Sequence, residues 1–282
     1  MNQFPSQGQT GSASNVPANP LGTLPINQLL ARFAIPSIIA MLVSALYNIV
    51  DQFFIGRSVG MLGNAATNVA FPLTITCTAL SLMFGIGGAA NFNLSMGHGE
   101  REDAARYAGN AVFMLFFTGL ILCLGVRLFL KPLMIAFGAT AEVLDYSLVY
   151  TGITSLGFPF LILTTGGSNL IRADGSPRFS MVCTLTGALI NTILDPLFIF
   201  TFHMGMAGAA LATISSQLFS VILVILCLTR TQDMYKVEWR KIRIDSRMLQ
   251  RIIRIGIPAG MQSVMYNISN IIIQAGVNNL GT

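Results

Sequence analysis

Charged residues are scarce in this sequence. They make up 10% of the 282 residues, whereas soluble domains carry roughly 25%, and this scarcity argues against a soluble protein. Apolar residues take their place and form blocks of about 20 residues, the length that a helix needs to cross a bilayer. We therefore predict an all-α polytopic membrane protein with seven helices, at residues 33–55, 68–93, 108–130, 146–171, 178–201, 206–229 and 252–277.

The first 24 residues contain no charged side chain at all. They are rich in Gly, Ser, Asn and Pro and lack the basic start and compact apolar core of a secretory signal. We interpret residues 1–24 as a disordered tail on the cytoplasmic side of the membrane.

Groups that build metal or catalytic centres are also few. His98 and His203 are expected at opposite faces of the membrane, which excludes a joint metal site. The cysteines lie on different predicted helices without a CxxC pair, and we interpret them as small apolar core residues: Cys77, Cys123, Cys183 and Cys227. No nucleophile and base stand together, so an enzyme is not expected.

The stretch GIGGAA at 85–90 fits the glycine pattern of a dinucleotide-binding turn. That pattern has meaning only between a strand and a helix, and here it lies inside an apolar helix. We interpret these small residues as a place where two helices pack closely.

Basic residues are distributed unevenly between the two sides of the membrane. With a cytoplasmic N-terminus, cytoplasmic segments hold 13 of the 16 Lys and Arg, and the external loops hold Arg57, Arg127 and Lys131. The positive-inside rule thus predicts a multi-pass protein of the cell (inner) membrane with its N-terminus in the cytoplasm. The same rule accounts for the net charge of +5 without nucleic acid as a partner.

Two segments far apart in the chain are alike. Residues 35–52 and 257–274 share five identities when Pro36 is aligned with Pro258. We interpret the seventh helix as the start of a second six-helix unit, an organisation known from secondary transporters. The predicted parts are a tail at 1–24, a six-helix unit at 25–229, a basic connector at 230–250 and the seventh helix at 251–282.

Only two of the 11 acidic residues, Asp51 and Asp195, lie inside apolar blocks. A carboxylate at membrane depth costs roughly 2.5–3.5 kcal/mol, so it usually faces the bundle interior or a watery cavity. Asp195 and Thr213 lie at similar distances from the turn between the fifth and sixth helices, and Asn191 is one turn from Asp195. We predict that these groups meet if the first, fifth and sixth helices pack together.

Pro196 adds a further oxygen to this predicted site. Because proline has no N–H, the carbonyl of Thr192 loses its helical partner. Carboxylate, amide, hydroxyl and carbonyl oxygens suit a hard cation such as sodium. A buried carboxylate can instead hold a proton, since burial disfavours its charged form. The sequence leaves sodium, proton and a purely structural role open.

Several stretches resemble the multidrug and toxic compound extrusion (MATE) transporters. They are FAIPSIIAMLVSALYNIVDQFFIG (33–56), GHGERED (97–103), NLIRADGSPR (169–178), NTILDP (191–196) and GMAGAALAT (205–213). The resemblance implies two six-helix lobes around a central cleft, exporting drugs in exchange for sodium or protons. The chain is then expected to hold the N-lobe and the first helix of the second lobe.

The resemblance also implies roles for particular residues. Its N-lobe cation site, which would bind sodium in a sodium-coupled protein, matches Asp51, Asn191, Asp195 and Thr213. Expected neighbours are Tyr47, Asn48, Gln52, Tyr150 and Asn169, and the expected helix-bending residues are Pro36 and Pro196. No cofactor besides the coupling ion is expected, and the expected partners are a drug-like small molecule and membrane lipid.

Two other interpretations fit the sequence. A flippase for lipid-linked precursors, from the same superfamily, would line its cleft with basic residues, which the first six helices lack away from their ends. An inert fragment, or one that needs a partner, is also compatible with a chain whose seventh helix is followed closely by Thr282. In the partner-requiring case another chain would complete the lobe, whereas for a transporter the second lobe is expected from the rest of the chain.

Overall fold

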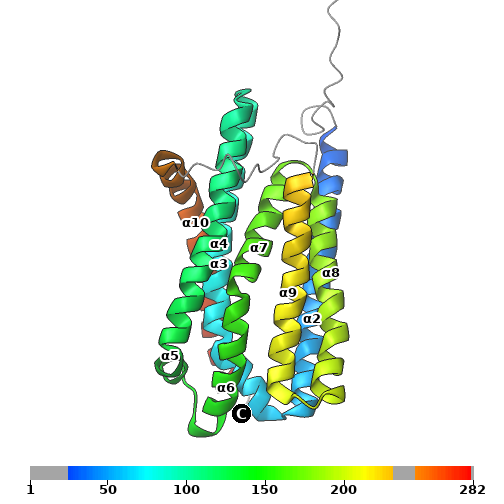
Figure 1. Cartoon of the computed structure of the whole chain (residues 1–282), viewed down its shortest axis with the longest axis vertical. Coiled ribbons are helices and arrows are strands. Elements are labelled where there is room, and N and C mark those ends of the chain that lie inside the picture. Colours follow the sequence, from blue (N-terminus) through cyan, green and yellow to red (C-terminus); the bar gives the residue numbers. More distant parts are fainter. Residues whose placement is uncertain (1–24, 231–244, 281–282) are drawn as a thin grey trace, which may run out of the picture.

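A computed structural model describes residues 25–230 and 245–280 of the chain, and within these ranges it is helical without strands (Figure 1). The elements are α2 (Ile26–Ser58), α3 (Met61–Gly97), α4 (Arg101–Leu128), α5 (Leu130–Ala136), α6 (Ala141–Thr154), η1 (Ser155–Gly157), α7 (Phe158–Ala173), α8 (Pro177–Pro196), η2 (Leu197–Thr201), α9 (Gly205–Arg230) and α10 (Ser246–Leu280). The predicted all-α fold class is confirmed.

Within the described ranges, six segments are long and apolar enough to cross a membrane. They are Ile26–Ser58, Met61–Gly97, Arg101–Leu128, Ala141–Ala173, Pro177–Thr201 and Gly205–Thr229. They correspond to the first six predicted blocks. The fourth is divided into α6 and α7 by the short 3₁₀ turn η1, which ends two residues before Pro159, near the start of α7.

The seventh predicted block forms α10, 35 residues long, but α10 is not among the six candidate membrane spans. Polar residues such as Gln262, Ser263 and Asn267 lower the hydropathy of this helix below that of the others. The block is therefore confirmed as a helix, and its apolar character was overestimated.

The two ends of the bundle differ in charge. One end, which we call the basic end, carries the start of α2, the α3–α4 and α7–α8 turns and the start of α10 (Figure 1). Its basic residues are Arg32, Arg101, Arg106, Arg172, Arg178, Arg247, Arg251 and Arg254, whereas Arg57, Arg127 and Lys131 lie toward the opposite end. The fold thus separates the charges as the sequence predicted, and a cytoplasmic basic end stays a prediction.

Helix α3 packs against α4, α7 and α10, and small residues allow these close contacts. A side chain at Gly85 would collide with the backbone of Gly166 on α7, and one at Gly88 would collide with Ala111 on α4. The GIGGAA stretch is therefore a helix-packing surface, as the sequence predicted.

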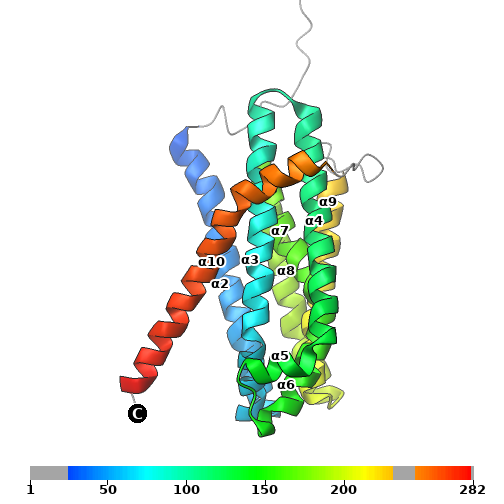
Figure 2. The same cartoon turned by 90° about the vertical axis from the view of Figure 1, so that its left-hand side faces the viewer.

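Helix α10 crosses α3 obliquely, and its far end leaves the bundle (Figure 2). At the crossing, Ile252, Gly256 and Gly260 are buried at intervals of four residues along α10. A Cβ atom at Gly256 would overlap the carbonyl oxygen of Met83 on α3. The two helices therefore touch through their backbones, and this contact requires glycine.

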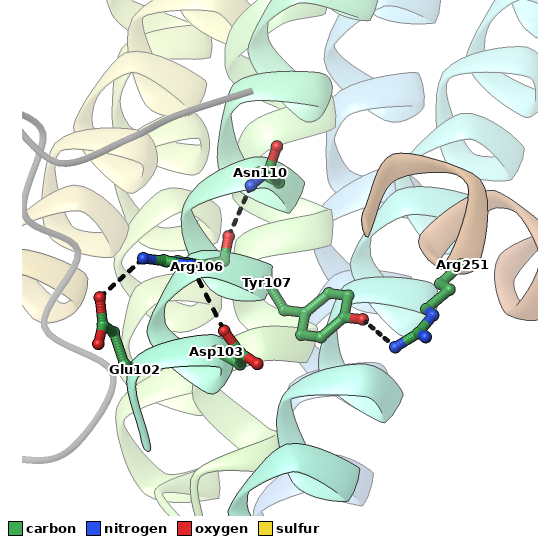
Figure 3. A network of polar contacts seen from close by, with 6 residues as sticks. All are labelled: Glu102, Asp103, Arg106, Tyr107, Asn110 and Arg251. Atoms are coloured by element: carbon green, nitrogen blue, oxygen red, sulfur yellow. Dashed lines mark hydrogen bonds and ion pairs between the residues drawn. The ribbon is translucent and has the colours of Figure 1, made fainter. Parts of the chain in front are cut away.

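Polar contacts hold the start of α10 against α4 (Figure 3). The Arg251 guanidinium donates a hydrogen bond to the Tyr107 hydroxyl at 3.1 Å. The backbone N–H of Asp245 donates to Asn110 Oδ1 at 3.2 Å, and the Asp245 carboxylate caps α10 by accepting from the N–H of Arg247 at 2.8 Å. Together these bonds attach α10 to the basic end of the lobe.

We expect Gly256→Val to separate α10 from α3, because the added atoms meet backbone that cannot move aside. Overpacking of this kind costs about 1–3 kcal/mol, which thermal unfolding in detergent would measure. The matched control is Gly125→Val on α4, where an added Cβ meets no other atom within 4 Å. Equal losses of stability in the two variants would contradict the close crossing.

Candidate cation-binding site

Three helices bring the predicted acidic, amide and hydroxyl groups together. Asp51 lies on α2, Asn191 and Asp195 lie on α8, and Thr213 lies on α9. Helix α8 packs against both α2 and α9, and α2 also contacts α9. The packing that the sequence required for these groups to meet is therefore present.

The two intramembrane carboxyl groups face each other. Asp195 is completely buried and Asp51 is 8% exposed, and their side chains lie within hydrogen-bonding reach. Asn191 Nδ2 donates a hydrogen bond to Asp195 Oδ1 at 3.4 Å. Within the described ranges, no Lys or Arg forms an ion pair with either carboxylate. Charge on this pair is therefore not compensated by a basic side chain of the described part.

Three buried oxygen atoms of this cluster have no hydrogen-bond partner among the residues that the structure describes: Asp51 Oδ1, Asp195 Oδ2 and Asn191 Oδ1. An unsatisfied buried acceptor costs about 1–3 kcal/mol, and more when the group is charged. A group that brings positive charge or donors would relieve this cost. A sodium ion, a shared proton or an ordered water fits these oxygens.

Two tyrosines border the carboxyl pair. Tyr47 on α2 and Tyr150 on α6 both lie close enough to interact electrostatically with Asp51 and Asp195. The Tyr150 hydroxyl also lies within hydrogen-bonding reach of Thr213, whose own hydroxyl donates to the carbonyl of Ala209 at 3.0 Å. Both tyrosines thus lie next to the carboxyl pair, where they were expected as neighbours of the cation site.

Of the other predicted neighbours, Gln52 contacts the carboxyl pair directly, whereas Asn48 and Asn169 do not. The Gln52 side chain interacts with Asp51 and accepts a hydrogen bond from the Thr67 hydroxyl of α3 at 3.1 Å. Asn48 is exposed, and its amide donates to the carbonyl of Ser44 on its own helix. Its side chain also lies within hydrogen-bonding reach of Tyr47, so it contacts the border of the cluster and not the carboxyl groups themselves. Asn169 lies near the basic end, where it contacts Arg172.

Thr67 is a member that the sequence did not reveal. Threonine is common in membrane helices and often bonds to its own backbone, as Thr67 also does with the carbonyl of Asn64 at 2.8 Å. Its bond to Gln52 depends on how α2 and α3 pack, which no spacing along the chain shows.

Pro196 marks a change of helix type next to Asp195. Helix α8 ends at this proline and continues directly as the π-helical turn η2. Since proline interrupts the regular hydrogen-bond ladder, a wider turn is a reasonable consequence, and such turns often occur at functional sites. Pro36, in contrast, lies buried within the unbroken helix α2, whose start leans away from the bundle (Figure 2).

Comparisons with known proteins agree on one family. A family model described as MatE matches residues 36–197. The multidrug export protein MepA of Staphylococcus aureus is 26% identical over 257 residues, which cover 91% of this chain and 57% of that protein. The chain thus spans little more than half the length of the curated relatives it matches.

Solved structures show the same fold. A crystal structure of a MATE mutant superposes with a TM-score of 0.86 at 22% identity, covering 95% of this chain and 60% of that one. An outward-facing multidrug resistance MATE family transporter of the MOP superfamily gives a TM-score of 0.81 at 23% identity, covering 90% and 56%. The helices of this chain are therefore arranged as in those transporters.

We expect sodium or acid to raise the thermal stability of the chain, because either neutralises the carboxyl pair in the folded state. Binding adds about 1.4 kcal/mol at ten times the dissociation constant. Thermal unfolding in sodium chloride against choline chloride, and across pH, measures this gain. The double variant Asp51→Asn, Asp195→Asn should lose it, while Glu142→Gln, at an exposed carboxylate on α6, should keep it. An equal gain in all three proteins would contradict the site.

Proposed function

The chain belongs to the MatE family, and from this premise we propose that it is the six-helix lobe of a cation-coupled exporter of drug-like molecules. One observation supports the coupling most strongly. Two buried carboxyl groups from different helices face each other, and within the described ranges one oxygen of each, together with the amide oxygen of Asn191, has no hydrogen-bond partner. Such an arrangement favours uptake of a positive charge. The multidrug export function named for MepA supports drug-like cations and amphipathic molecules as the cargo.

Electrostatics explains how occupancy of the pair would act on the helices. Two like charges about 4 Å apart repel each other by about 4 kcal/mol at an effective dielectric constant of 20. A sodium ion or proton removes this repulsion and lets α2 and α8 approach. Loss of the cation pushes the same helices apart. The pair is thus proposed to switch the contact between α2 and α8.

Helix α2 is suited to transmit this change. It carries Asp51 near one end and Pro36 near the other. Pro36 leaves the carbonyl of Arg32 without its helical donor, which weakens the helix at that point. We propose that α2 bends at Pro36 when the carboxyl pair gains or loses its cation.

The membrane potential is large enough to drive such a switch. One charge that crosses the full field changes the free energy by about 2.3 kcal/mol per 100 mV, which shifts a two-state equilibrium roughly fifty-fold. We further propose that the basic end faces the cytoplasm of the cell membrane. The apolar surface of α2, largely exposed in the described part, would then contact lipid and the second lobe.

Gradient-driven efflux tests the proposed function. Vesicles that contain the protein, loaded with a fluorescent cationic dye, should expel dye faster when a sodium or pH gradient is imposed. Asp195→Asn should reduce this gradient-dependent rate about 5- to 150-fold, the usual range of coupling between two sites. Glu142→Gln is the matched control. Gradient-dependent efflux that survives Asp195→Asn unchanged would exclude the proposed coupling.

We expect Pro36→Ala to suppress the response of α2 to the cation, because alanine restores the missing backbone donor. Spin labels at the exposed positions Leu30 on α2 and Phe179 on α8 would report the distance with and without sodium or acid. Pro72→Ala, at a proline inside α3, is the control and should keep the response. If the distance between the two labels in the protein that keeps Pro36 is the same with and without sodium or acid, bending of α2 is ruled out.

A further inference from the structure

A cavity of about 520 Å³, lined by apolar side chains together with several Ser and Thr hydroxyls, lies between α2, α7, α8 and α9, and neither Asp51 nor Asp195 lines it. Near the basic end it is lined by Pro36, Arg172 and Pro177, and at its other end by Tyr47. Tyr47 also borders Asp51 and Asp195. The cavity therefore extends from the basic end of the bundle to the neighbourhood of the carboxyl pair.

The lining of this cavity indicates that it holds water. Ser168 on α7 is 6% exposed, and its hydroxyl has no hydrogen-bond partner. The hydroxyl of Thr164, one turn earlier on α7, also has none. Both residues line the cavity. Buried hydroxyls are normally satisfied, and a cavity of this size has room for on the order of ten waters at about 30 Å³ each.

Arg172 is the only charged residue among the described residues that line the cavity. Its guanidinium donates a hydrogen bond to Asn169 Oδ1 at 2.5 Å, which holds the charge in place. Within the described ranges, no carboxylate forms an ion pair with it. Arg32 and Arg178 line an adjoining groove that shares Pro36 with the cavity. Three arginines that form no ion pair within the described ranges therefore lie at or beside the part of the cavity nearest the basic end.

We propose that Arg172 is an electrostatic barrier that admits water and neutral or anionic solutes to this cavity and excludes cations. Ser168 lies one helical turn from Arg172, about 6 Å along the axis. At that distance a like charge is disfavoured about 3- to 100-fold, for effective dielectric constants between 80 and 20. If the proposed function holds, the barrier keeps cations from leaking between the carboxyl pair and the basic end in this conformation. The coupling ion and a cationic cargo would then pass the basic end in another conformation, reached when α2 bends at Pro36, which also lines the cavity.

Charge-selective labelling tests the barrier without any transport assay. The protein carries Ser168→Cys in a background whose four cysteines, Cys77, Cys123, Cys183 and Cys227, are replaced by alanine, and it is placed in lipid nanodiscs. Three methanethiosulfonates of similar size, one neutral, one cationic and one anionic, react with the new thiol. Each rate is divided by the rate of that reagent with 2-mercaptoethanol.

We expect the normalised rate of the cationic reagent to be about tenfold below that of the neutral one, and the anionic reagent not to be slowed. Arg172→Gln should remove the difference, and Arg172→Lys should preserve it. Arg178→Gln, at an exposed arginine, is the control and should have a smaller effect, because solvent ions screen exposed charges. Arg172→Lys keeps the positive charge, and thermal unfolding shows whether each variant is folded. Together they distinguish loss of charge from loss of fold.

Three results would overturn the proposal. Equal rates of the cationic and neutral reagents would show that no barrier exists. A thiol that reacts with none of the reagents would show that the cavity is closed. An unchanged rate of the cationic reagent in Arg172→Gln would show that cations are excluded elsewhere. None of these results bears on the sodium and pH dependence of the carboxyl pair. The barrier at Arg172 and the cation coupling can therefore fail independently.

Discussion

Two carboxyl groups that face each other inside an apolar bundle are the main physical constraint on this lobe. Asp51 and Asp195 are buried on neighbouring helices, and within the described ranges neither forms an ion pair with a basic side chain. In the proposed function, a positive charge or a proton reduces the repulsion between the two groups and so holds α2 against α8. We propose that the movement of this cation is thereby coupled to the positions of the two helices.

The remaining features of the fold serve to position this pair. Helix α3 packs against α4, α7 and α10 through small residues, so these helices form a closely packed frame. Helix α2 is attached differently, mainly through α8, and much of its surface is exposed. The part of the lobe that carries Asp51 is thus the part least enclosed by the others. The cavity beside it, which Arg172 lines near the basic end, is where we propose that water is admitted and cations are excluded.

The sequence predicted the helices and the meeting of the acidic residues, because both depend on strong local signals. Apolar blocks of bilayer length stand out, and a carboxylate inside such a block is costly enough to have few possible surroundings. The sequence could not predict the contact of Gln52 with Thr67, the exposure of Asn48 or the distance of Asn169 from the pair. These depend on helix rotation and crossing, for which serine, threonine and asparagine give no periodic signal. Arg172 directly follows the predicted helix at 146–171, and only the packing of α7 against α9 and α8 shows that it lines a cavity.

Infrared difference spectroscopy of the carboxyl groups tests the central claim most directly. Spectra of the protein in lipid, recorded with and without sodium and at several pH values, separate protonated carboxyl groups from carboxylates. We predict a change in the carboxyl bands when sodium or protons are added, and its loss in the double variant Asp51→Asn, Asp195→Asn. Cation binding by the pair would be contradicted if the carboxyl bands changed with neither sodium nor protons, or if they changed equally in the double variant.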